Sequence, residues 1–146
     1  PKATAHTQLH QPLPPDDMQG YAQLAEQCPI PIAGGEHEFT ARGFAEWIDR
    51  RLHRVLQPDV CWCGGLTEVV KIYRHAQGAG LRVCPHRGAE AWSLPAIAAL
   101  DAQPLAESGR PWIAWLSGQP QPIDGQVRIS DRPGFGVEVD PGIWAP

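Results

Sequence analysis

Three short apolar runs, spaced roughly 25 residues apart, constrain the fold of this chain more than any other feature. They are residues 30–33, 54–57 and 81–84, and each pattern predicts a short buried strand. The segments between them carry apolar residues at helical spacing. A regular alternation of strand and helix is typical of βα units around a parallel sheet, so we predict an α/β protein.

The predicted helices occupy the segments between the strands. One helix is expected over residues 17–27, capped by Asp16 or Asp17, and another begins near Ser93 with Pro95 in its first turn. Two more follow from apolar residues at helical spacing, the first of these within residues 40–53. The eight residues that carry this spacing are Phe44, Trp47, Ile48, Leu52, Val69, Ile72, Tyr73 and Ala76.

The sequence changes character near Trp112, where Gly and Pro become frequent between short apolar stretches. Such a pattern predicts short hairpins and loops rather than another βα unit. We therefore divide the chain into a βα body, residues 1–111, and a tail, residues 112–146.

Composition excludes several classes of protein. The chain has 146 residues, of which 42% are apolar, which is enough for the packed core of one domain. A formal net charge of −4 provides no basic field for nucleic acid. The sequence also contains neither an apolar run of membrane-spanning length nor a signal-peptide pattern. We expect a cytoplasmic chain that binds neither nucleic acid nor membrane.

Four cysteines raise a separate possibility. Reduced thiols are the default in a domain of this size, but Cys61 and Cys63, together with Cys84 and His86, offer four soft ligands that zinc could use. Against this, the pairs are separated by one residue, a spacing that suits strand alternation better than a zinc-binding turn. Zinc is therefore an alternative, not the leading hypothesis.

Ionisable side chains follow each expected strand. Glu36 and His37 follow the first, Asp59 follows the second, and His86 and Arg87 follow the third. Parallel strands joined by helices place all their carboxyl ends at one edge, which is where ligands and catalytic residues gather in such folds. We therefore expect a functional site at this edge.

Each member of the expected site has a functional and a structural interpretation. Glu36, after a turn of two glycines, could bind Mg²⁺ or only cap the following helix, and His37 could contact substrate or solvent. Asp59 and His86 could form an acid–base pair, because neighbouring strands lie about 5 Å apart. Alternatively, Asp59 caps its loop and His86 is a partly buried polar group.

Other aromatic and imidazole side chains are expected to have structural roles. We predict that Trp62, Trp92 and Trp112 belong to the core or to a pocket wall. His53 and His75 are expected on helices, among charged neighbours and in contact with solvent.

Four motifs carry a resemblance to a known family. "IPIAGGEHEF", "LQPDVCWCGGLTE", "VCPHRGAEAW" and "PLAE" resemble the catalytic half of the enolase superfamily, mandelate racemase/muconate lactonizing enzyme subgroup. Within it, they are most similar to acid-sugar dehydratases of the L-rhamnonate dehydratase type. The resemblance implies the C-terminal half of a (β/α) barrel, with the tail packed on the barrel or on a capping domain.

The resemblance also implies site residues and a cofactor. Glu36 matches a Mg²⁺ ligand, and His10 stands where a second metal-binding glutamate is expected. Asp59 and His86 match the catalytic dyad. Glu107 matches an acidic residue that contacts substrate, and we expect His37 and Arg87 beside it.

The activity implied is removal of the proton next to a carboxylate, followed by loss of water from an acid sugar to give a 2-keto-3-deoxy acid. The parent protein would be a Mg²⁺-dependent lyase and a homo-oligomer, of which this chain would be a C-terminal fragment. A racemase or epimerase of the same superfamily remains an alternative, as does a truncated fragment without activity.

Overall fold

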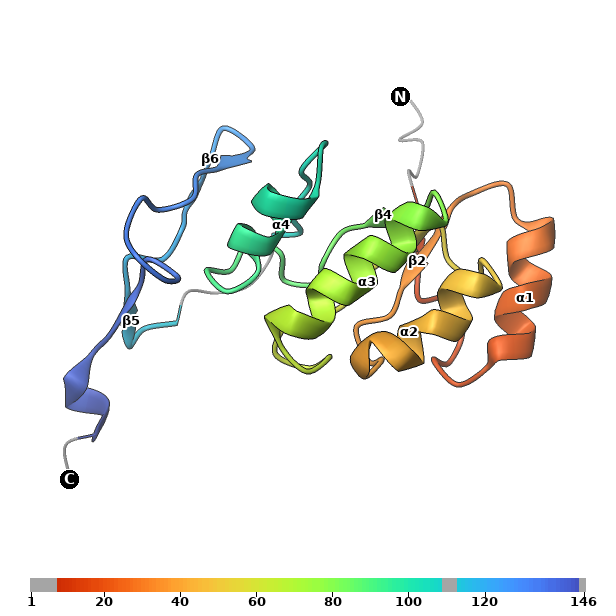
Figure 1. The fold of residues 1–146 in the computed structure, drawn as a ribbon, viewed down its shortest axis with the longest axis horizontal. Helices are drawn as coiled ribbons and strands as arrows, with labels where there is room; N and C mark the ends of the chain where they lie inside the picture. The colour runs from red at the N-terminus through yellow and green to blue at the C-terminus, as the bar shows by residue number, and fades with distance from the viewer. Residues whose placement is uncertain (1–7, 109–112, 145–146) are drawn as a thin grey trace, which may run out of the picture. The chain divides into compact units, whose positions relative to one another are not determined.

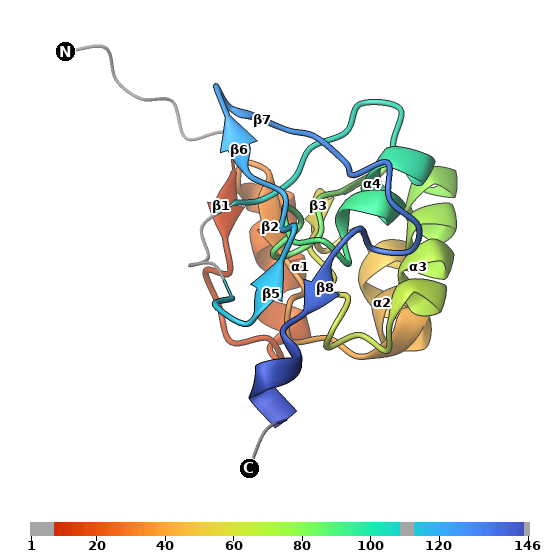
Figure 2. The ribbon, with the colours of Figure 1, turned by 90° about the vertical axis from the view of Figure 1, so that its left-hand side faces the viewer.

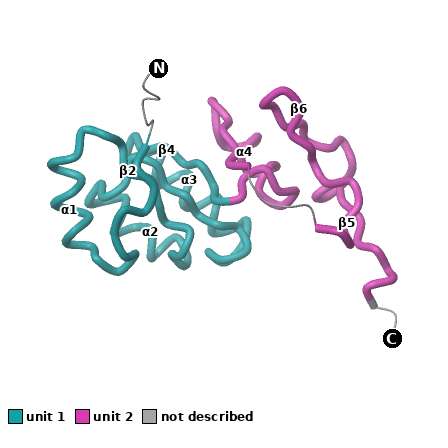
Figure 3. Tube along the Cα trace, turned by 180° about the vertical axis from the view of Figure 1, so that it is seen from behind, with its two compact units in different colours: residues 1–86 teal, residues 87–146 magenta. Residues whose placement is uncertain are grey.

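A computed structural model describes residues 8–108 and 113–144 of the chain. It divides into two compact units, residues 1–86 and residues 87–146, which Figure 3 distinguishes by colour. The boundary that we predict at residues 111 and 112 lies outside the described residues, as does Trp112.

The first unit contains a parallel sheet of four strands. They are β1 (Leu9–His10), β2 (Ile32–Gly34), β3 (Val55–Leu56) and β4 (Arg82–Val83), and they pair in sequence order. Figures 1 and 2 show the unit from two sides. The three predicted strands are confirmed, although shorter than expected, and β1 is added before them. This repeated alternation of strand and helix around a parallel sheet makes the unit α/β, as predicted.

Three helices connect these strands. They are α1 (Met18–Gln27), α2 (Thr40–Asp49) and α3 (Leu66–Gly78). The Asp17 side chain caps α1 by accepting a hydrogen bond of 2.8 Å from the Gly20 amide, as the sequence predicts. All eight apolar residues on which the two middle helices were predicted are buried. No helix in the described parts of the chain is both long and apolar enough to cross a membrane.

Two expectations about α2 and its surroundings are wrong. The helix ends at Asp49 rather than continuing to residue 53, because Arg51 adopts a left-handed conformation (φ 54°) that no helix can continue through. His53 therefore lies beyond the helix, and it is fully buried instead of solvated. Its ring packs against Trp47 and Tyr21, with ring centroids 4.3 and 4.6 Å away.

The second unit begins with one helix. α4 (Leu94–Leu100) follows Ser93 and carries Pro95 in its first turn, as predicted. The Ser93 side chain makes no capping hydrogen bond.

The described remainder of this unit contains two short antiparallel pairs joined by loops, in agreement with the hairpins and loops predicted for this part of the chain. β5 (Leu116–Ser117) pairs with β8 (Glu138–Val139), and β6 (Pro122–Ile123) pairs with β7 (Gln126–Val127). A 3₁₀ helix, η1 (Pro141–Trp144), follows β8. The β6–β7 turn places both Asp124 and Gly125 at positive φ, which is the backbone of a tight hairpin turn with a favourable twist.

Candidate functional site

The carboxyl ends of the strands in the first unit bring three predicted residues to one edge. Glu36 follows β2, Asp59 follows β3 and His86 follows β4. Asp59 and His86 lie opposite each other in a parallel backbone bridge, and the His86 amide donates to the Pro58 carbonyl at 3.1 Å. The parallel pairing thus continues beyond the strands and fixes the backbone of both residues.

Glu36 is surrounded by imidazole rings. Its Oε2 atom lies 3.0 Å from Nδ1 of His86 and 3.7 Å from Nε2 of His10, while its Oε1 atom lies 3.4 Å from Nε2 of His37. Gly35, with φ 114°, makes the turn that directs the chain away from β2. The fold therefore gathers residues from three different strand ends around one carboxylate.

The Glu36 carboxylate is the least accessible part of this cluster. Its side chain is 18% exposed, compared with 43% for His10 and 54% for His37. The Oε2 atom is buried and accepts no hydrogen bond of suitable geometry from the described residues, although the His86 nitrogen is close. A buried carboxylate oxygen without a donor has an unused capacity to bind a cation or a polar hydrogen.

Asp59 stabilises the loop that follows β3. Its Oδ1 atom accepts a hydrogen bond of 2.7 Å from the Cys61 amide, and its carbonyl accepts from the amides of Trp62 and Cys63. This is the structural role that the sequence left open. It does not conflict with the acid–base role, which stays a prediction.

Arg87 and Glu107, the remaining predicted substrate contacts, belong to the second unit. The Glu107 carboxylate accepts a hydrogen bond of 2.8 Å from the Arg87 amide, and the Glu107 carbonyl accepts from the Ala89 amide. The Arg87 guanidinium pairs with Glu90, its Nε atom 2.7 Å from Oε1. The structure thus gives both residues a role in ordering this loop, and their contact with substrate stays a prediction.

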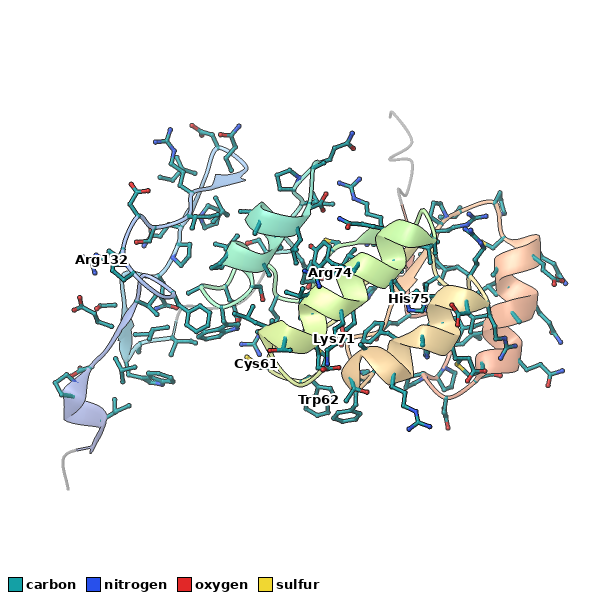
Figure 4. The ribbon with its side chains drawn as sticks, viewed as in Figure 1. Cys61, Trp62, Lys71, Arg74, His75 and Arg132 are labelled. Carbon is teal, nitrogen blue, oxygen red and sulfur yellow. The ribbon has the colours of Figure 1, made fainter. Side chains whose placement is uncertain are left out.

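An exposed aromatic pair beside Glu36 was not anticipated from the sequence. Trp62 is 51% exposed and Phe39 56% exposed, and their ring centroids lie 5.5 Å apart. The His37 ring meets Trp62 edge-on at 6.2 Å. Figure 4 shows Trp62 beside the beginning of α3. Its exposure excludes the core, and its alternative place in a pocket wall stays a prediction. Phe39 follows directly after the Gly-Glu-His-Glu motif, which is the only signal that could have identified it.

The donors around Glu36 do not match the Mg²⁺ that the resemblance implies. Mg²⁺ takes oxygen ligands, whereas the neighbours of this carboxylate are imidazole nitrogens, which suit transition ions better. Within residues 8–108 and 113–144, no three His, Cys, Asp or Glu side chains are already grouped to hold one metal ion.

The cysteine alternative gains no support from geometry, because Cys61, Cys63, Cys84 and His86 do not form a group that could hold a metal ion among the described residues. Burial raises the pKa of Cys63 to about 11. Cys84 is also buried, and Cys61 is exposed.

Comparison with known proteins supports the resemblance. A family model described as "Enolase C-terminal domain-like" matches residues 6–143. An L-rhamnonate dehydratase from Saccharopolyspora erythraea is 35% identical over 92% of this chain. Among solved structures, an L-talarate dehydratase from Polaromonas sp. JS666, complexed with Mg and L-glucarate, is 30% identical with a TM-score of 0.83 over 95% of this chain. A 3,6-anhydro-D-galactonate cycloisomerase from Zobellia galactanivorans is 31% identical with a TM-score of 0.80 over 92%.

These relatives are considerably longer than the chain. It spans 37% of the Saccharopolyspora protein, 38% of the Polaromonas protein and 40% of the Zobellia protein.

Proposed function

Because this chain belongs to the enolase C-terminal domain-like family, we propose that it forms the acid–base part of an acid-sugar dehydratase. The reaction would convert a sugar acid to a 2-keto-3-deoxy acid, as in the L-rhamnonate dehydratase to which the chain is similar. One observation carries the proposal: Glu36, Asp59 and His86 occupy the carboxyl ends of successive parallel strands, with His86 Nδ1 3.0 Å from Glu36 Oε2.

His86 is the proposed catalytic residue. A carboxylate oxygen beside Nδ1 favours the tautomer with the proton on that nitrogen, which leaves Nε2 to exchange a proton with substrate. Nε2 would remove the proton from C2, and the electrons of that bond would form the C2–C3 double bond as the C3–O bond breaks. His86 would return the proton to the departing hydroxyl, releasing water, and the enol would become the 2-keto acid.

The other residues would support this proton transfer. Asp59, 7% exposed and opposite His86, would stabilise the imidazolium that forms when His86 takes the proton. Glu36 would hold the His86 ring in place through its contact with Nδ1. A divalent cation, when bound, supplies positive charge that makes the C2 proton more acidic. The donors around Glu36 do not fit Mg²⁺, so the proton transfer is assigned to His86 itself.

The test is an assay of the chain, both alone and joined to the part of the Saccharopolyspora relative that it does not match. L-rhamnonate and other sugar acids would be supplied in D₂O with Mg²⁺ or Zn²⁺, and the 2-keto-3-deoxy acid measured. We expect product from the joined form, and a loss of about 100-fold or more in His86→Asn. If no sugar acid gives product in either form, the proposal is wrong.

Two controls make the assay specific. His75→Asn changes another histidine that faces a carboxylate, with Nε2 2.8 Å from Asp49 Oδ1, and should leave the rate unchanged. Figure 4 shows His75 on α3, away from the strand-end loop of Cys61 and Trp62. Deuterium entering C2 without loss of water would instead assign the racemase or epimerase activity.

A further inference from the structure

His10 changes the chemistry of the site more than any other residue. It lies on β1, paired in register with Ala33 of β2, and its Nε2 atom points to within 3.7 Å of Glu36 Oε2. A glutamate at this position would add a second carboxylate beside Glu36. Histidine instead contributes a neutral nitrogen donor and removes one negative charge from the cluster.

The two donors define a preference among cations. Mg²⁺ depends on hard oxygen ligands and releases its waters reluctantly, so a lone carboxylate beside an imidazole binds it weakly. Zn²⁺ accepts both donor types, and ligands about 2.1 Å from one ion can be separated by the distance found between His10 and Glu36. The buried Oε2 atom accepts no hydrogen bond of suitable geometry from the described residues, so a metal ion bound to it would share it only with the His86 ring, whose Nδ1 lies 3.0 Å away.

We propose that His10 makes this site selective for a divalent transition ion of the zinc class over Mg²⁺, with Nε2 of His10 and Oε2 of Glu36 as protein ligands and water or substrate oxygens as the others. The inference rests on the proposed function only for the location of the site. Its readout is metal binding without substrate, so an absence of dehydration would contradict the proposed function alone.

Calorimetric titration of the full chain with Zn²⁺ and with Mg²⁺ tests the preference. The wild-type chain should bind Zn²⁺ more tightly than Mg²⁺. His10→Glu should weaken Zn²⁺ binding about 10-fold and strengthen Mg²⁺ binding by a similar factor. His10→Gln, which removes the imidazole without adding charge, should weaken Zn²⁺ binding and leave Mg²⁺ binding unchanged.

His75→Glu is the matched control. It makes the same substitution in a histidine that also faces a carboxylate and is similarly exposed, 40% against 43% for His10. Both affinities should be unchanged in this variant. Circular dichroism would confirm folding, and His10→Gln decides the matter if His10→Glu does not fold. The proposal is overturned if both His10 variants bind Zn²⁺ as tightly as the wild type, or if the wild type prefers Mg²⁺.

Discussion

The two units of this chain bury apolar surface to different extents. In the first, each short strand is part of one parallel sheet, and the apolar faces of α2 and α3 are fully buried. In the second, strands pair only in twos. Among the described residues, seven of the nine large apolar side chains that are exposed lie in the second unit. These are Leu105, Trp115, Ile123, Ile129, Phe135, Val139 and Ile143.

This difference indicates what stabilises each unit. Residues of the first unit are held by tertiary packing, so substitutions there should create clashes or bury unpaired polar groups. Two-stranded pairs are only marginally stable by themselves, so the second unit depends more on the local backbone preferences of its turns. The same chemical change should therefore have unequal effects in the two units.

The largest expected effect is the loss of stability of the first unit in acid. Burial, and secondly the neighbouring His10, lowers the pKa of His53 from 6.5 to about 3. Above pH 6.5 the ring is neutral in both the folded and the unfolded state, so its contribution is constant. As the pH falls from 6.5 towards 3, only the unfolded state takes up the proton, and the free energy of unfolding decreases by about 1.4 kcal/mol per pH unit.

Denaturant unfolding of wild type and His53→Leu between pH 8 and pH 4 measures how much of the pH dependence of the free energy of unfolding comes from His53. Both nitrogens of His53 are buried, and neither has a hydrogen-bond partner within residues 8–108 and 113–144. The leucine should therefore cost little at pH 8 and should reduce the acid dependence. An unchanged pH dependence in His53→Leu would contradict the assignment.

The next effect compares one substitution in both units. Gly35→Ala places a methyl group at φ 114° and 2.8 Å from the Phe44 ring, so strain and overpacking should together cost about 3 kcal/mol. Gly125→Ala, at φ 74° with no atom within 4 Å of the new methyl, should cost only the backbone strain of about 1 kcal/mol. Denaturant unfolding of both variants measures the two losses of stability. Equal losses would contradict the expected difference between the two units.

The sequence predicts those parts of the structure that depend on neighbouring residues. Local signals were sufficient to predict the cap at Asp17, the place of Pro95 in the first turn of α4 and the buried faces of α2 and α3. Capping and helical spacing depend only on residues a few positions apart. The end of α2 was mispredicted because Leu52 continues the apolar spacing, although Arg51 has already left the helix. His53 was misplaced for the same reason.

The candidate site was predictable in its location but not in its contacts. Ionisable residues after successive strands indicated one edge, since parallel topology brings those ends together. The resemblance placed His10 in the same metal site as Glu36, although no apolar run marked β1. The contact of His37 with Glu36 depends on side-chain directions beyond the end of β2. The exposed pairing of Trp62 with Phe39 depends likewise on the packing of two loops.

A smaller effect contrasts the helix caps of the two units. Asp17 accepts a hydrogen bond from the Gly20 amide at α1, so Asp17→Ala should cost about 1 kcal/mol. Ser93 precedes α4, but its buried hydroxyl makes no hydrogen bond in the described structure, so Ser93→Ala should leave stability unchanged or slightly increase it. Unfolding curves of both variants measure the two losses of stability. A larger loss for Ser93→Ala than for Asp17→Ala would contradict the conclusion that only Asp17 caps its helix.

The smallest expected effect is a change in thiol labelling, which reports which unit opens. All four cysteines lie within residues 1–86, so thiol labelling reports only on the first unit. Cys61 is exposed and should react at once, whereas Cys63 is fully buried and its pKa is raised to about 11, first by burial and also by the charge of Asp59. Its reaction should therefore require unfolding of this unit.

Mass spectrometry of pulse-labelled chain would follow the two thiols separately. Because the cap at α1 belongs to the first unit, Asp17→Ala should accelerate the labelling of Cys63 about 5-fold, the equivalent of 1 kcal/mol. Ser93→Ala should not change it, since that residue belongs to the second unit. Labelling of Cys63 as fast as Cys61 in the native chain would mean that the loop after β3 opens without the sheet, and that the protection of Cys63 does not depend on the core of the first unit.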